Sequence, residues 1–265
     1  MKITSLAGLR RQPLMEAALA SLPQAVQITA YARSKAFKIN EIVRELHEQS
    51  FEWYGFTLAH SRAPEIVVDV GLPRNAQNLT QYTSIEPEAI AAFQETLPPE
   101  MLINGWLHSH GDLELHDFSS ADDANQLTVL DYVTAALKLI VAKQEIPIKD
   151  LKLLVEGRYS PEDLALGSVS LITEAPVAKA RLLEAVMGGF CYSMVIGDAG
   201  WTRQEIYYKR RGVLTGQTHI SHQKADLVVL DDGRELTHSA LAELAEAVKR
   251  HIHPSPYIPP RLENM

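Results

Sequence analysis

The pattern of apolar and polar positions divides the chain into helices and strands. One helical face is formed by apolar side chains that recur every three or four residues: Ile39, Ile42, Val43 and Leu46. The stretches FEWYGFTLAH (51–60) and EIVVDVGLP (65–73) are rich in aromatic and β-branched residues and predict two strands of a hairpin. A helix at 86–97, with acids and an early proline, and a buried strand LINGWLHSH (102–110) are predicted next.

After a polar loop the periodicity becomes helical again from Ser120. Further strands are predicted at 149–157, 167–175, 189–197, 203–213 and 224–232. Helices are predicted at 177–187 and 237–251, and QTHISHQ (217–223) is interpreted as a polar connection between strands. This mixture of helices and strands predicts the α/β fold class.

Composition and charge restrict the classes of partner. The net charge is −8, and Lys and Arg form no dense cluster beyond Lys209, Arg210 and Arg211, which argues against nucleic acid as the main partner. The single cysteine, Cys191, excludes an internal disulfide and a thiolate-rich metal site, and it is interpreted as a core residue. No stretch approaches the roughly 20 apolar residues of a membrane span, so we expect no membrane association and a cytoplasmic location.

The polar loop after the strand 102–110 contains the candidate chemistry. Side chains alternate along a strand, so His108 and His110 project on the same side and both imidazoles can reach one ion. Asp122 in the first turn of the following helix is the candidate third ligand, and the three together would leave a fourth position for water, as in hydrolytic zinc sites. Alternatively, a serine caps the helix and the aspartates only complement its dipole.

Glu52 is the candidate proton carrier. It stands at the head of a predicted apolar strand, where burial of an unpartnered carboxylate is costly. A metal-activated water needs such a base to accept its proton and pass it to the leaving amine. The alternative is that Glu52 only marks the solvated end of the strand.

Taken together, a glutamate in an ExxGxxL strand, then HSH at a strand end, then SxxD at a helix start resembles the JAMM signature of the JAB/MPN metallopeptidases. The resemblance implies a cytidine-deaminase-like fold, a curved mixed β-sheet flanked by helices. It implies that His108, His110 and Asp122 hold Zn²⁺, that Glu52 acts as general base and then acid, and that Ser119 donates to the oxyanion. Similar members are zinc isopeptidases that cleave ubiquitin or ubiquitin-like proteins from their targets.

Two departures from the family pattern affect the register of the motif. Gly111 follows the second histidine where the family usually has proline, and GDLELHDF (111–118) is one residue longer than the usual spacer. Consequently Ser120 with Asp123 also satisfies SxxD. Ser119 with Asp122 is preferred because it requires the smaller insertion.

The resemblance also suggests a domain organisation. Residues 1–35 are expected to be an N-terminal extension, 36–232 the metallopeptidase domain, and 233–265 a C-terminal helix and tail. An insertion at about 137–188 follows the metal-site helix. We expect it, with 72–84, to border a groove for a substrate tail, or else to be an additional structural strand pair and helix.

The expected function is a zinc-dependent peptidase that cleaves after the C-terminal tail of a ubiquitin-like protein, as in bacterial members that accompany ubiquitin-like conjugation systems. Two alternatives belong to other classes. One is an MPN scaffold that binds protein partners and does no chemistry, although all five motif residues are present. The other is a JAMM hydrolase of small-molecule amides or thiocarboxylates, because the motif specifies the reaction type and not the leaving group.

Overall fold

The computed structural model describes residues 19–74, 85–113, 115–149 and 179–254. Within them the helices and strands follow one another in the order β1 (Val26–Thr29), α1 (Ala30–His47), β2 (Trp53–His60), β3 (Ile66–Val67), β4 (Asp69–Gly71), α2 (Pro87–Gln94), β5 (Met101–Ser109), α3 (Ser120–Ala136), β6 (Leu139–Lys149), β7 (Lys179–Ile196), β8 (Thr202–Gly212), β9 (Thr218–Lys224), β10 (Leu227–Leu230) and α5 (His238–His251). The protein is therefore a mixed α/β structure.

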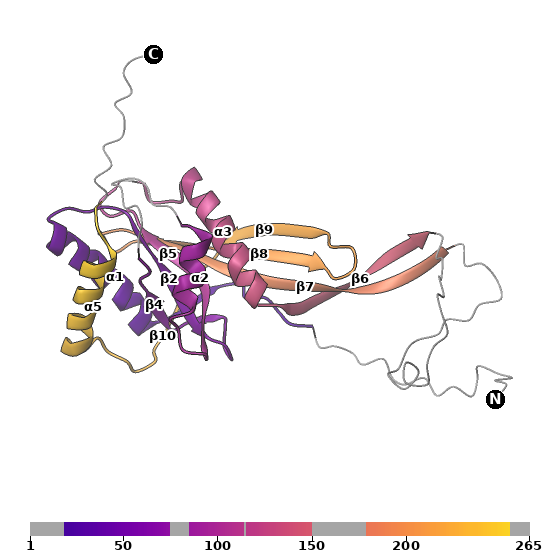
Figure 1. Ribbon diagram of the computed structural model, residues 1–265, viewed down its shortest axis with the longest axis horizontal. Helices are drawn as coiled ribbons and strands as arrows, with labels where there is room; N and C mark the ends of the chain where they lie inside the picture. Colours follow the sequence, from indigo (N-terminus) through magenta and orange to yellow (C-terminus); the bar gives the residue numbers. More distant parts are fainter. Residues whose placement is uncertain (1–18, 75–84, 114, 150–178, 255–265) are drawn as a thin grey trace, which may run out of the picture.

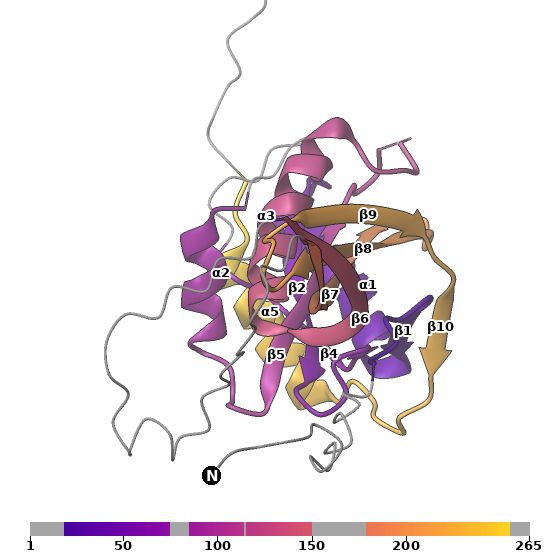
Figure 2. The ribbon, with the colours of Figure 1, turned by 90° about the vertical axis from the view of Figure 1, so that its right-hand side faces the viewer.

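The centre of the body is an open, mixed seven-stranded sheet. Its order is β4-β2-β5-β7-β8-β9, and β6 pairs with β7 in addition. The β5–β7 pair is parallel, and the neighbouring pairs are antiparallel. A smaller parallel sheet, β10-β1-β3, lies at one side of the body, with α2 on the other (Figure 2).

Helices cover both faces of the large sheet. Side chains alternate along its strands, so each face carries side chains that pack against a helix. On one face, Trp106 of β5 donates its indole N–H to Gln126 of α3. On the other face, Trp53 of β2 donates to Asn40 of α1 at 2.7 Å. The core between these layers is continuous, and both tryptophans are fully buried in it.

One part of the sheet extends beyond the body. β6 and the first half of β7 form a two-stranded arm that projects away from α1 and α5 (Figure 1). β8 pairs with β7 only from Val186 onward, so among the described residues the outer part of the arm consists of β6 and β7 alone. The arm lies in the segment expected to be an insertion at about 137–188, of which 150–178 lie outside the described residues, as do 75–84.

Several predicted elements need correction. The helix predicted at 177–187 is wrong, because Lys179–Met187 belong to β7, where ladders with β6 and β8 outweigh the helical spacing of the apolar residues. The stretch 217–223 is strand β9 and not a polar connection, because it pairs along β8. Residues 26–35 form β1 and the start of α1, and β1 pairs with β10 and β3. The domain boundaries at 35 and 232 stay a prediction.

Two predicted elements are confirmed, the helix at 237–251 and the hairpin. α5 begins after Thr237, whose hydroxyl accepts from the Ala240 backbone N–H, as predicted for the helix at 237–251. The predicted hairpin is the antiparallel pair β2 and β4. No described helix has both the length and the apolar character needed to cross a membrane.

Candidate metal centre

Strand pairing brings Glu52 to the two histidines. In the antiparallel pair of β2 and β5, Tyr54 lies opposite His108 and Trp53 opposite Ser109. Glu52 directly precedes β2 and His110 directly follows β5, so alternation directs both side chains to the face that also carries His108. Oε1 of Glu52 lies 3.9 Å from Nε2 of His110.

The N-terminus of α3 supplies the third side chain. Ser119 is the N-cap, and Oδ2 of Asp122 accepts from the Ser119 backbone N–H at 2.6 Å and from its hydroxyl at 2.8 Å. This capping arrangement directs the other oxygen, Oδ1, to within 3.2 Å of Nε2 of His108. Capping and contact with the histidines therefore coexist in one carboxylate.

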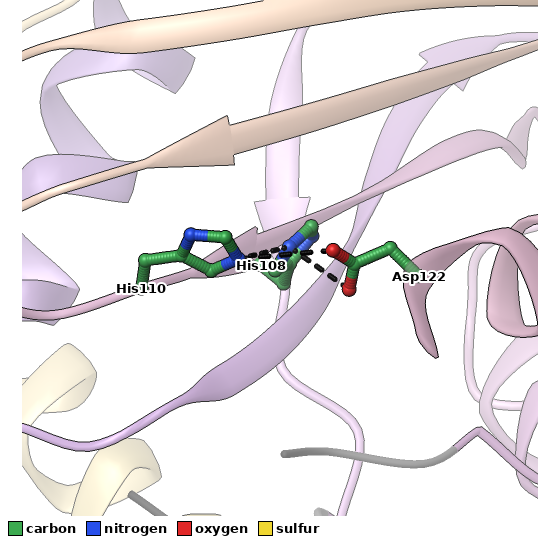
Figure 3. Close-up of side chains that lie close together, drawn as sticks. All are labelled: His108, His110 and Asp122. Carbon is green, nitrogen blue, oxygen red and sulfur yellow. Dashed lines mark hydrogen bonds and ion pairs between the residues drawn. The ribbon is translucent and has the colours of Figure 1, made fainter. Parts of the chain in front are cut away.

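The three side chains converge on one point between the end of β5 and the start of α3 (Figure 3). Nε2 of His108 lies 3.1 Å from Nε2 of His110, which lies 3.7 Å from Oδ2 of Asp122. One donor atom from each residue lies within 4.8 Å of the others, and all three residues are buried. Among the described residues this is the one His, Cys, Asp and Glu group with such spacing.

The spacing fits a shared metal ion. Ligand atoms about 2.0–2.1 Å from a tetrahedral ion are about 3.3 Å apart, close to the distances between these donors. Nδ1 of His110 lies 2.9 Å from the Leu115 carbonyl, and a donated N–H there makes its Nε2 a lone-pair acceptor. Two imidazole nitrogens at contact distance need a proton or a cation between them. The cluster could therefore hold a metal ion.

Burial and mutual contacts set the protonation of the site. Complete burial lowers the pKa of His108, which favours the neutral form that binds metals. Burial also opposes the charge on His110, but hydrogen bonds with Asp122 and the Leu115 carbonyl outweigh it and raise its pKa. For Asp122, the hydrogen bonds from both histidines outweigh burial and hold the pKa well below its usual range.

Glu52 has the opposite shift. Its side chain is buried, and burial, with a smaller contribution from the Asp122 charge, raises its pKa to about 7, against the influence of His110. A carboxyl with this pKa can both accept and donate a proton near neutral pH. Glu52 is therefore not at the solvated end of the strand.

The structure distinguishes the two registers of the SxxD motif. Asp122 lies in the cluster, whereas Asp123 is exposed and its Oδ1 accepts from the Tyr207 hydroxyl at 3.4 Å. Consecutive residues of a helix point about 100° apart, so only one of the two can face His108. The side chain of Ser120 lies outside the described part of the chain.

Two aromatic contacts at the site were not predicted. Trp106 stacks on His108 with ring centroids 4.5 Å apart. Trp201 stands edge-on to His110, with ring centroids 6.2 Å apart, and it also contacts His116, with ring centroids 4.6 Å apart. The two-residue spacing of Trp106 and His108 in a strand is a signal that could have revealed the first contact. No local pattern links Trp201 to the site, because its loop reaches His110 only through the sheet.

Two other pairs of polar side chains lie outside the cluster. Asp117 forms an exposed ion pair with Lys224 at 3.1 Å. In the stretch QTHISHQ, Nδ1 of His222 lies 3.0 Å from Oε2 of Glu205. These two residues form a pair and not a three-ligand group.

The expected substrate groove, formed by 72–84 and 137–188, depends largely on 75–84 and 150–178, which lie outside the described residues. It therefore stays a prediction. What the site can do is inferred from its own side chains, because no protein-family model matches the chain and no curated protein matches it in sequence.

Proposed function

We propose that this protein is a zinc-dependent isopeptidase or peptidase of the JAMM type, which cleaves after the C-terminal tail of a ubiquitin-like protein by metal-activated water. The observation that carries the proposal is the buried cluster of His108, His110 and Asp122 with Glu52 beside it. The order of these residues, on the end of a strand, a helix N-terminus and the head of a neighbouring strand, supports a JAB/MPN-like fold.

The donor set supports zinc as the metal. Two imidazoles and one carboxylate, with a fourth position open, are typical of hydrolytic zinc sites. The one cysteine, Cys191, is buried, and burial raises the pKa of its thiol to about 12, so no thiolate is offered. A buried free thiol is also compatible with the proposed cytoplasmic location.

Each residue then has a definite task in amide hydrolysis. His108, His110 and Asp122 would hold the zinc, which would supply a Lewis acid for the scissile carbonyl and for water. Glu52 accepts a proton from the water as its oxygen adds to the carbonyl carbon. When the carbon–nitrogen bond breaks, the amine keeps the electron pair and Glu52 returns the proton to it. A carboxyl pKa of about 7 suits both steps.

Ser119 is the proposed donor to the developing oxyanion. Its hydroxyl donates to Oδ2 of Asp122 at 2.8 Å and its side chain is half-buried. The oxyanion role therefore requires the hydroxyl to exchange this partner for the substrate oxygen. The backbone N–H of Ser119 keeps Asp122 oriented while this happens.

The proposal is tested first by metal content. Purified wild type is compared with His108→Ala, Asp122→Ala and Glu52→Gln by elemental analysis. We expect about one zinc per chain, lost in the first two variants and kept in Glu52→Gln. A folded wild type that binds no zinc would overturn the proposal and favour a non-catalytic scaffold.

The second test concerns the substrate. A ubiquitin-like protein fused through its C-terminal tail to a reporter is incubated with wild type and Glu52→Gln. We expect cleavage by the wild type and about 10²–10⁴-fold slower cleavage by the variant. In direct competition, preference for a small-molecule amide over the fusion would reject the protein substrate while leaving the hydrolytic site intact.

A further inference from the structure

A group of positive side chains gathers at the root of the arm. It consists of Lys138, Lys143, Lys209, Arg210 and Arg211, from the start of the arm and the end of β8. We call this group the arm-root cluster. The chain as a whole carries 25 Lys and Arg against 33 Asp and Glu, so the cluster is a local excess of positive charge on an acidic protein.

The cluster surrounds the arm because side chains alternate along β8. Lys209 and Arg211 lie on the α3 side and, with Lys138, line a pocket of about 380 Å³. Arg210 points to the opposite side and lines a second pocket of about 610 Å³ with Gln144 and His219. Both faces of the arm root therefore offer a hollow lined by positive charge.

Among the described residues, the acids in ion pairs with the cluster compensate only part of its charge. Asp131 is paired with Lys209 at 2.6 Å. The buried carboxylate of Glu184 accepts from the backbone N–H groups of Leu214 and Thr215 and is used within the fold. In the described part of the chain, no ion pair involves Lys138, Lys143, Arg210 or Arg211, and all four are exposed.

A structural role accounts for only part of the cluster. Lys138 follows the C-terminus of α3, where a positive charge complements the helix dipole. Arg210 lies on the other side of the sheet, and Lys143 is in the arm, so neither is explained in this way. Closely spaced like charges repel one another, and an anionic partner would relieve that repulsion.

We propose that the arm-root cluster is a docking surface for an acidic segment of a partner protein. A short run of Asp and Glu can place a carboxylate beside Lys138 and Arg211 in the pocket on the α3 side, or beside Arg210 in the pocket on the opposite side. A nucleic acid fits less well, because no Phe, Tyr or Trp stands among the described residues of either pocket for bases to stack on. Its long phosphate backbone would also meet a chain of net charge −8.

The test measures binding of a fluorescent oligoglutamate peptide by anisotropy, with oligoglutamine as the uncharged comparison. The arm-root variant is Arg210→Glu with Arg211→Glu. Its matched control is Lys249→Glu with Arg250→Glu, which makes the same charge change on exposed positions of α5, at the far end of the molecule from the arm (Figure 1). Circular dichroism checks that both variants fold. If the arm-root variant does not fold, Arg210→Gln with Arg211→Gln replaces it.

We expect the wild type to bind oligoglutamate and not oligoglutamine, with an affinity that decreases as salt increases. The arm-root variant should bind oligoglutamate at least about tenfold more weakly than the wild type. The α5 variant should bind it with the affinity of the wild type. Equal weakening in both variants, absence of binding, or tighter binding of a single-stranded oligonucleotide would overturn the proposal. Because Asp122→Ala should bind the peptide normally, the result is independent of the metal centre.

Discussion

Ser119 and Asp122 form a two-point contact at the start of α3, in which Oδ2 of Asp122 accepts from both the backbone N–H and the hydroxyl of Ser119. The contact leaves Oδ1 directed at His108, 3.2 Å from its Nε2. The same interaction thus begins the helix and orients the oxygen that is the candidate metal ligand. Groups that orient ligands in this way are part of a metal site although they do not touch the ion.

Removing the hydroxyl of Ser119 should therefore weaken metal binding without abolishing it. We expect Ser119→Ala to raise the dissociation constant for zinc about tenfold or more, because the backbone N–H continues to hold Asp122. Competition with a fluorescent chelator measures this. Ser239→Ala, at an exposed serine of α5, is the control and should leave the affinity unchanged. An unchanged affinity in Ser119→Ala would show that the hydroxyl does not orient the carboxylate.

The two neighbouring aspartates should respond differently to the same change. Asp122→Asn removes the charge beside both histidines, so bound metal should be lost. Asp123→Asn removes an exposed charge whose contact is Tyr207, so bound metal should be retained. Elemental analysis of the two purified variants distinguishes these outcomes, and loss of metal only in Asp123→Asn would reverse the assignment of the ligand.

The raised pKa of Glu52 makes the stability of the metal-free protein depend on pH. Burial raises this pKa from 4.5 to about 7, so the contribution of the protonated carboxyl is complete below pH 4.5 and is lost as the pH rises through about 7. We expect this loss to be about 2 kcal/mol after solvent screening. Urea unfolding of chelator-treated protein at several pH values measures it. Glu52→Gln should remove most of this dependence, and an identical profile in both proteins would contradict the buried carboxyl.

Gly105 permits the close contact between β5 and β7 near the site. An added Cβ at Gly105 would overlap the Tyr192 carbonyl and lie 2.8 Å from the Tyr192 backbone nitrogen. Gly105→Ala should therefore lower the free energy of unfolding by about 3 kcal/mol or more.

Gly200→Ala provides the comparison for Gly105→Ala. Nothing lies within 4 Å of the added methyl group, but φ is +81°, so only backbone strain of about 1 kcal/mol is expected. Urea unfolding of both variants measures the two losses. Equal losses would show that overlap with Tyr192 contributes nothing.

Glu184 should hold the turn between β8 and β9 against the arm. Its carboxylate accepts from the Gln144 amide, from the Leu214 backbone N–H at 2.8 Å, and from the backbone N–H and hydroxyl of Thr215 at 3.0 and 2.9 Å. These hydrogen bonds outweigh burial and lower the Glu184 pKa to about 2. Its stabilising contribution is therefore present above pH 4.5 and is lost as the pH falls to about 2.

Hydrogen exchange followed by NMR tests this role. In Glu184→Ala the amides of Leu214 and Thr215 lose their acceptor and should exchange faster. Lys143→Ala, an exposed change in the same arm, should leave both rates unchanged. Unchanged rates in Glu184→Ala would show that the turn is held by other contacts.

Local patterns were sufficient for the parts of the site that depend on one element. The alternation of β5 placed His108 and His110 on one side, and the capping pattern at Ser119 located the start of α3. Both follow from backbone geometry over a few residues, so no knowledge of distant neighbours was required. The sequence allows both Asp122 and Asp123 as the ligand, because one inserted residue in the loop changes which of them faces the histidines.

Distant pairing decided what the local patterns missed. The stretch 177–187 has the apolar spacing of a helix, yet residues 179–187 belong to β7, because β6 supplies hydrogen-bonding partners along one edge and β8 joins the other edge from Val186 onward. The strand β9 looked like a loop because its side chains are polar and exposed, and its pairing with β8 does not depend on them.

By itself, the sequence determined the order of most helices and strands, the face shared by the two histidines, and the start of a helix near Ser119 and Ser120. These properties depend on the periodicity of the backbone, which a few neighbouring residues express. Only the tertiary structure decided that Glu52 lies beside His110, that Trp201 stands over the site, and that positive charges surround the root of the arm. Those contacts join segments far apart in the chain, so they exist only after the sheet has paired and its side chains have been buried together.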